Sequence, residues 1–133
     1  MVKYNDLERY REQYISTLPP EELTTLLYNE IIKNLTKAIN KIQENQVGEA
    51  HFPIIKAQDI LLHLMSSLDL NVPVSSNLMS LYDYMYNTLI SANVKKDAAL
   101  LEQVKNMVKD LKDTWQQAII ISKSESHAIG QCV

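Results

Sequence analysis

The sequence predicts an all-α protein, an antiparallel four-helix bundle preceded by a short N-terminal helical segment. Three observations indicate this fold. Apolar residues recur at every third or fourth position through four long stretches, as they do along the buried face of a helix. The chain contains only two glycines and four prolines, so few helix breakers interrupt these stretches. The links between the stretches are short, which favours antiparallel neighbours in a bundle.

The length of 133 residues corresponds to one domain with a core of its own. We expect an N-terminal segment at residues 1–19, either mobile or docked on the bundle, and the bundle itself at residues 20–121. Residues 122–133 are polar and are expected to form a disordered C-terminal tail.

Prolines mark where the first two long helices begin and end. The first should open at Pro20, because proline suits the first helical turn, and should end near Asn45. The second should start around residues 49–50 and stop before Pro73. Pro53 then lies in its first turn, where backbone N–H groups have no partner inside the helix.

The stretch 54–70 is apolar over a wider arc than the face of an ordinary surface helix. Its polar side chains gather on one narrow strip, formed by Lys56, Asp59, His63, Ser66 and Ser67. The helix therefore needs apolar neighbours on both flanks, or it forms part of a groove for a partner. Gln58 is the polar residue inside the arc. It is either a buried amide satisfied by a neighbour or a hydrogen-bonding group for a bound peptide.

The third helix should begin at a cap formed by Ser75 or Ser76, and it carries two apolar stripes side by side. The first stripe comprises Leu78, Leu81, Met85, Leu89 and Ala92. The second comprises Met79, Tyr82, Tyr86, Ile90 and Asn93. One stripe suffices for a core, so the second is a candidate contact surface, although Tyr82 and Tyr86 could equally be core residues. The fourth helix should be capped by Asp97.

No constellation of residues indicates an enzyme, and we expect no catalytic residue, no metal site and no cofactor. Asp59 and His63 share a helix face, but two ligands are too few for a metal site. The net charge of −3, without a dense cluster of Lys and Arg, argues against a nucleic-acid partner. No apolar run reaches the roughly 18 residues of a membrane span. The charged N-terminus lacks the apolar core of a signal peptide, so a cytoplasmic location is expected.

One alternative function stays open at this point. Histidine phosphotransfer modules are also four-helix bundles with an exposed histidine, a role that His63 could fill. Leu64 and Met65 stand where small and basic residues would be expected after such a histidine, so the motif is weak.

Five blocks of sequence, taken together, resemble the flagellar secretion chaperone family FliS from Tyr10 to Ile119. The blocks are PEELTTLLYN (20–29), IIKAQDILLHLMSSLD (54–69), LYDYMY (81–86), LISANVKKD (89–97) and LKDTWQQAI (111–119). The resemblance implies a four-helix export chaperone that binds the C-terminal region of flagellin. It also implies that flagellin stays unpolymerised until a component of the flagellar export gate takes it. Whether the chaperone forms a homodimer is left open.

The candidate partner-binding residues combine the resemblance with the surplus apolar surface. They are Tyr10, Ile15, Ile55, Gln58, Leu62, Met79, Tyr82, Tyr86, Ile90 and Asn93. Tyr10 matches the conserved N-terminal tyrosine of the family. We expect the N-terminal segment to dock in the same groove when flagellin is absent, and the flagellin segment to bind there as short helices.

Overall fold

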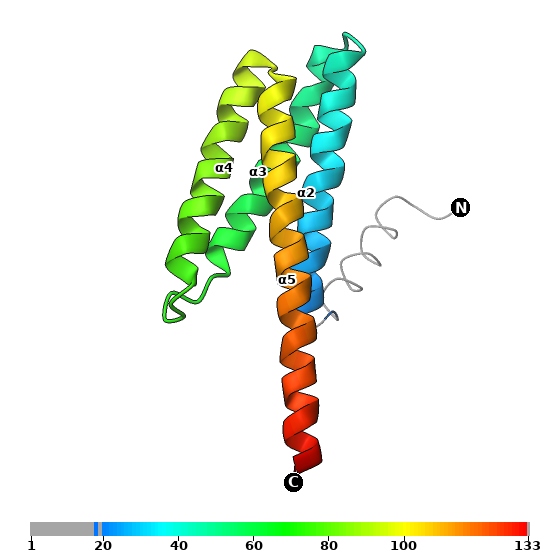
Figure 1. Cartoon of the computed structure of the whole chain (residues 1–133). Coiled ribbons are helices and arrows are strands. Elements are labelled where there is room, and N and C mark those ends of the chain that lie inside the picture. The colour runs from blue at the N-terminus through cyan, green and yellow to red at the C-terminus, as the bar shows by residue number, and fades with distance from the viewer. Residues whose placement is uncertain (1–17, 19, 133) are drawn as a thin grey trace, which may run out of the picture.

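Four stretches with three-four apolar spacing form the helices of a bundle in the computed structural model of the chain. The structure describes residue 18 and residues 20–132, with side chains up to residue 124. Within this part the helices are α2 (Pro20–Gln43), α3 (His51–Ser66), α4 (Ser75–Lys95) and α5 (Ala98–Cys132), and a short 3-10 helix, η1 (Val47–Ala50), precedes α3. Consecutive helices run in opposite directions (Figure 1). The predicted all-α bundle is confirmed.

Each long helix of the bundle packs against two others. α2 and α4 each lie against both α3 and α5, so the four helices enclose one core. The side chains that are fully buried at its centre are Ile31, Leu35, Ile54, Leu61, Met85, Leu89, Leu101, Val104 and Val108. All four helices contribute to this list. Each helix therefore buries its main apolar face against the other three, and no additional layer of structure is needed to cover it.

The helix starts predicted from the sequence are confirmed at three points. α2 opens at Pro20, and Pro53 is the third residue of α3, inside its first turn. Asp97 caps α5, because its Oδ1 accepts hydrogen bonds from the backbone N–H groups of Ala99 at 2.9 Å and Leu100 at 3.3 Å.

The predicted serine cap of α4 is wrong. The chain enters α4 through Val74, whose φ of −72° and ψ of −17° are already helical, so no side chain caps this end. Ser75 is therefore the first helical residue and is buried, while the Ser76 hydroxyl donates to the carbonyl of Pro73 at 3.4 Å. A capping serine needs an extended backbone, which the turn before α4 does not provide.

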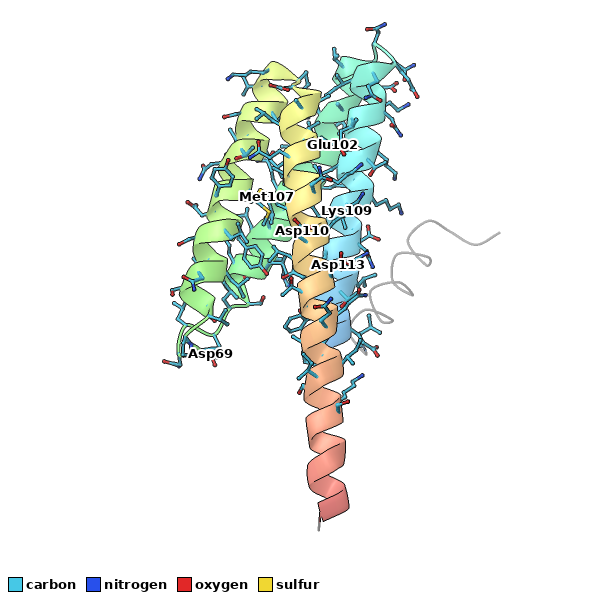
Figure 2. The ribbon with its side chains drawn as sticks, viewed as in Figure 1. Asp69, Glu102, Met107, Lys109, Asp110 and Asp113 are labelled. Carbon is cyan, nitrogen blue, oxygen red and sulfur yellow. The ribbon has the colours of Figure 1, made fainter. Side chains whose placement is uncertain are left out.

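α3, the second long helix, ends at Ser66 and is therefore shorter than the apolar pattern of the sequence indicates. The hydroxyls of Ser66 and Ser67 donate to the backbone carbonyls of His63 at 2.8 Å and Leu64 at 2.9 Å. Side-chain bonds of this kind compete with the helical pattern. Residues 67–74 then form the connection to α4, on which Figure 2 labels Asp69.

The C-terminal tail was expected to be disordered, whereas the structure continues α5 as a helix to Cys132. No proline follows Pro73, and Gly130 is the only glycine in this part of the sequence, so little in the sequence ends the helix. As a result α5 extends well past the start of α2 (Figure 1).

A pair of buried phenols joins α2 to α4. The hydroxyls of Tyr28 and Tyr82 lie 2.6 Å apart, and the side chains are only 3% and 2% exposed. Burial raises the pKa of both phenols above the ordinary 10.0, because the charged phenolate is poorly solvated there. The two hydroxyls therefore stay neutral and satisfy each other inside the core.

Replacing one member of this pair should destabilise the bundle more than replacing both. Tyr82→Phe leaves the Tyr28 hydroxyl buried without its partner, which should lower the free energy of unfolding by about 1–3 kcal/mol. The double variant Tyr28→Phe/Tyr82→Phe removes both polar groups and should recover part of this loss. Urea unfolding followed by circular dichroism measures the difference. A Tyr82→Phe variant as stable as the natural chain would contradict this role of the pair.

The same pair should make the bundle sensitive to alkaline pH. Unfolded tyrosines release their protons near pH 10.0, whereas the buried phenols, with their raised pKa, hold them to higher pH. The stabilisation that the pair provides is therefore fully present below pH 10. Above this pH the free energy of unfolding falls by at most about 1.4 kcal/mol per pH unit for each phenol. Unfolding curves between pH 8 and pH 11 should show a steeper decline for the natural chain than for the double phenylalanine variant. Parallel declines would contradict the prediction.

Candidate partner-binding site

The relative orientation of α3 and α4 is fixed at one end by a polar contact. The Asn93 side-chain amide on α4 lies 3.0 Å from Nδ1 of His51 on α3. The Lys96 ammonium holds Asn93 from the other side, donating to its backbone carbonyl at 2.8 Å and to its side-chain oxygen. The rows of side chains that start at His51 and at Asn93 therefore lie on the flanks where the two helices face each other.

Both rows are mostly apolar beyond the His51–Asn93 contact, with Gln58 as the polar exception. On α3 the row continues from His51 at intervals of four, three and four residues to Ile55, Gln58 and Leu62. On α4 it runs back from Asn93 to Ile90, Tyr86 and Met79. Leu62 is 45% exposed and Ile90 is 40% exposed, and Ile55, Tyr86 and Met79 are half-buried. We use the name α3–α4 groove for the surface formed by these two rows, which contains seven of the ten predicted residues.

Gln58 lies on this flank and is 7% exposed, yet its Oε1 has no hydrogen-bond donor in the described part of the chain. The interpretation in which a neighbouring helix satisfies the amide therefore fails for its oxygen. An unpaired buried polar atom costs about 1–3 kcal/mol. The oxygen is thus a buried acceptor without a donor among the described residues, next to the apolar side chains of this flank.

Tyr82 was predicted to line the partner surface, and this prediction is wrong. Its ring is buried and its hydroxyl bonds to Tyr28 on α2. The buried stripe of α4 keeps Met85, Leu89 and Ala92 from the predicted core stripe and adds Tyr82, while Leu78 and Leu81 are half-buried. The spacing of three and four residues fits both stripes equally well, and spacing alone could not decide between them.

Two further predicted residues, Tyr10 and Ile15, lie outside the described residues. Tyr84, predicted to face away from the core stripe, is 50% exposed and accepts a hydrogen bond from Gln103 Nε2 of α5 at 2.9 Å. Tyr84 therefore lies on the flank of α4 that faces α5, away from the α3–α4 groove, and serves as a control position.

The α5 side of the bundle offers a more polar surface. Lys109, Asp110 and Asp113 are exposed along α5, and Figure 2 shows Met107 on the side of α5 toward α4. A hollow of about 230 Å³ there is lined by Leu81, Met107, Asp110, Leu111 and Thr114. Asp110 is the only charged residue of this lining, so the hollow is a second apolar surface, on the side of α4 toward α5.

Asp59 and His63, the pair considered for metal binding or phosphotransfer, are both exposed and form no ion pair with each other. Within residues 20–124 no group of three or more His, Cys, Asp or Glu side chains could hold a metal ion. Asp59 lines a hollow of about 380 Å³ between α2 and α3 together with Glu30, Lys33, Asn34, Lys37, Lys56 and Ile60. Charges of both signs border this hollow.

Comparison with known proteins identifies the family. The sequence profile described as "Flagellar protein FliS" matches residues 3–123. The chain belongs to the FliS family. The flagellar secretion chaperone FliS of Bacillus subtilis is 34% identical over 130 residues, covering 98% of each chain. FliS of Escherichia coli is 26% identical over 82% of each chain, and FliSB of Pseudomonas aeruginosa is 30% identical over 78% of this chain and 84% of its own.

Membership of the FliS family decides between the secretion chaperone and the histidine phosphotransfer module. FliS proteins are flagellar secretion chaperones and not enzymes, so the phosphotransfer alternative for His63 is set aside. None of the helices that the structure describes is long and apolar enough to cross a bilayer.

The unpaired oxygen of Gln58 gives a testable effect on stability. Gln58→Met has nearly the same shape without the buried polar atoms, and it should raise the free energy of unfolding of the free chaperone by up to about 1–3 kcal/mol. Gln58→Glu would bury a charge and should lower stability. The melting temperatures of the Gln58→Met and Gln58→Glu variants, measured by thermal unfolding without any partner, test both predictions. A lower melting temperature for Gln58→Met would mean that the amide is already satisfied in the free protein.

Proposed function

We propose that this FliS protein binds the C-terminal segment of flagellin in the α3–α4 groove. Binding there keeps flagellin unpolymerised in the cytoplasm until a component of the flagellar export gate takes it. The observation that supports the proposal is the pair of side-chain rows on α3 and α4, on which the apolar Leu62 and Ile90 are exposed, with the buried Gln58 in the α3 row. The names of the relatives describe secretion chaperones, and flagellin as the cargo follows from the family resemblance.

An amphipathic helix is the kind of segment that fits this surface. Apolar anchors at positions i, i+3 or i+4, and i+7 of the flagellin segment would meet Ile55 and Leu62 on α3 and Met79, Tyr86 and Ile90 on α4. Because the oxygen of Gln58 is buried in the free protein, its side chain would have to turn outward to accept a hydrogen bond from the peptide. Asn93 lies at one end of the groove, where its side chain contacts both His51 and Lys96.

The energetics favour a long apolar contact. Ordering a disordered flagellin segment costs about 2–5 kcal/mol or more of the interaction energy, so many side chains must contribute. Apolar contacts are hardly screened by salt, in contrast to contacts between exposed charges. Affinity for the flagellin segment should therefore change little between low and physiological ionic strength. A second copy of the chaperone would cover the same surface in a homodimer and would compete with flagellin.

Substitutions at the two exposed anchors test the groove. Leu62→Ser and Ile90→Ser should each weaken binding of a flagellin C-terminal peptide by about 1–2 kcal/mol, which is roughly fivefold to thirtyfold in Kd. Both side chains are 40% or more exposed in the free protein, so the melting temperature should change little. Isothermal titration calorimetry gives the affinity, and calorimetric unfolding gives the stability.

Two substitutions outside the groove serve as controls. Tyr84→Ala removes an exposed ring on the flank toward α5, and Val94→Ser removes an aliphatic side chain that is 81% exposed. Both should leave the peptide affinity unchanged. Equal affinity for the Leu62→Ser, Ile90→Ser and control variants would show that flagellin binds elsewhere on the bundle. A dimer of the free protein that dissociates on adding peptide would identify a second copy as the competing occupant.

A further inference from the structure

The contact that joins the start of α3 to the end of α4 depends on the orientation of one side-chain amide. The amide nitrogen of Asn93 lies 3.0 Å from Nδ1 of His51, and the amide oxygen lies farther from it, at 3.4 Å. The same oxygen accepts a hydrogen bond from the ammonium of Lys96. Because an ammonium group can only donate, Asn93 turns its oxygen toward Lys96 and its NH2 group toward His51.

Lys96 occupies a position where the turn alone would favour glycine. Its φ of 50° and ψ of 49° lie in the left-handed region, at the C-cap of α4. The ammonium also donates to the backbone carbonyl of Asn93 at 2.8 Å, and this carbonyl belongs to the last turn of α4. A glycine would fit the turn without strain, but it would not hold the amide of Asn93 in one orientation.

The orientation of the amide determines which form of His51 the contact requires. Since Asn93 donates, Nδ1 of His51 must carry a free lone pair, so the imidazole is neutral with its proton on Nε2. A second proton on the ring would set one N–H group against another and remove the hydrogen bond. The amide cannot turn over without taking its oxygen away from the ammonium of Lys96.

A protonated His51 would gain no ion pair to compensate for this loss. His51 is exposed, forms no ion pair with any described residue, and has the apolar ring of Phe52 5.6 Å from its own. The cations at this end are Lys95 and Lys96, at the end of α4. The acidic groups on the adjoining helix ends are engaged elsewhere, Glu44 and Glu49 with Lys41, Glu102 with Lys105, and Asp97 with the first N–H groups of α5.

We propose that His51 is a positioning residue for the α3–α4 groove, that it acts through Asn93, and that protonation of its ring opens this end of the groove. Ile55 and Ile90 come next along the two rows, so losing the contact changes the spacing between apolar anchors. Histidine usually changes its charge between about pH 8 and about pH 5, so the contact is complete at the upper end and is lost as the pH falls. Weaker binding of cargo in acid is the consequence. This consequence rests on the proposed function, whereas the opening is a property of the free protein.

NMR of the free protein tests the opening. Near pH 7.5 the ring nitrogen shifts of His51 should identify the form with the proton on Nε2, and the methyl signals of Ile55 and Ile90 should move on acidification to about pH 5.5. His51→Gln cannot gain a proton in this range and should abolish the movement. His63→Gln, on the exposed polar strip of α3, is the control and should retain it. A proton on Nδ1 near pH 7.5, or methyl movements that persist in His51→Gln, would overturn the proposal.

Calorimetric titration with a flagellin C-terminal peptide tests the effect on cargo. For the natural chain Kd should rise about threefold to tenfold between about pH 7.5 and about pH 5.5, which corresponds to one lost hydrogen bond. The rise should persist in His63→Gln and disappear in His51→Gln. Lys96→Gly suits the turn but frees the amide to offer its oxygen to a charged His51, so it should reduce the rise.

An equal rise in Kd for the natural chain and His51→Gln would overturn the effect on cargo, even if the free protein opens. A failure of the proposed function shows differently, as equal affinity of the Leu62→Ser, Ile90→Ser and control variants near pH 7.5. That comparison does not involve His51.

Discussion

The rotation of α4 about its own axis decides which of its side chains a partner can reach, and the burial of Tyr82, Met85 and Leu89 in the core defines that rotation. Tyr82 is buried in the core, where its hydroxyl and that of Tyr28 on α2 satisfy each other. Met85 and Leu89 follow it into the core by helical spacing. Tyr86 and Ile90 are then displaced to the flank that faces α3, where they remain partly or largely accessible.

The groove combines this flank of α4 with an apolar flank of α3 that the core does not use. Leu62 and Ile90 remain exposed in the free protein, and the oxygen of Gln58 has no donor within the described residues. Each of these features costs stability in the absence of a partner. Such costs are common where a surface has a binding function, because a partner satisfies what the free fold does not. The stability of the free chaperone and its affinity for cargo are therefore linked through the same residues.

The sequence allowed prediction of the bundle and of most helix starts, because these depend on local signals. Pro20 and Asp97 act within one turn of the residues they organise, and the spacing of apolar residues indicated both rows of the groove. The burial of Tyr82 could not be predicted, since two neighbouring stripes had equivalent spacing and the deciding partner, Tyr28, is 54 residues away in sequence. The end of α3 was also missed. Apolar residues continue beyond Ser66 in the sequence, whereas the helix ends there, where the hydroxyls of Ser66 and Ser67 bond back to the carbonyls of His63 and Leu64.

The central claim is that flagellin's C-terminal segment occupies the α3–α4 groove. An NMR titration of the methyl-labelled chaperone with that peptide tests it most directly, because each methyl group and side-chain amide reports its own surroundings. The largest shift changes should appear at the methyl groups of Ile55, Leu62 and Ile90 and at the side-chain amide of Gln58. If these signals stay unchanged while changes concentrate between α2 and α3 or at the end of α5, the claim is contradicted.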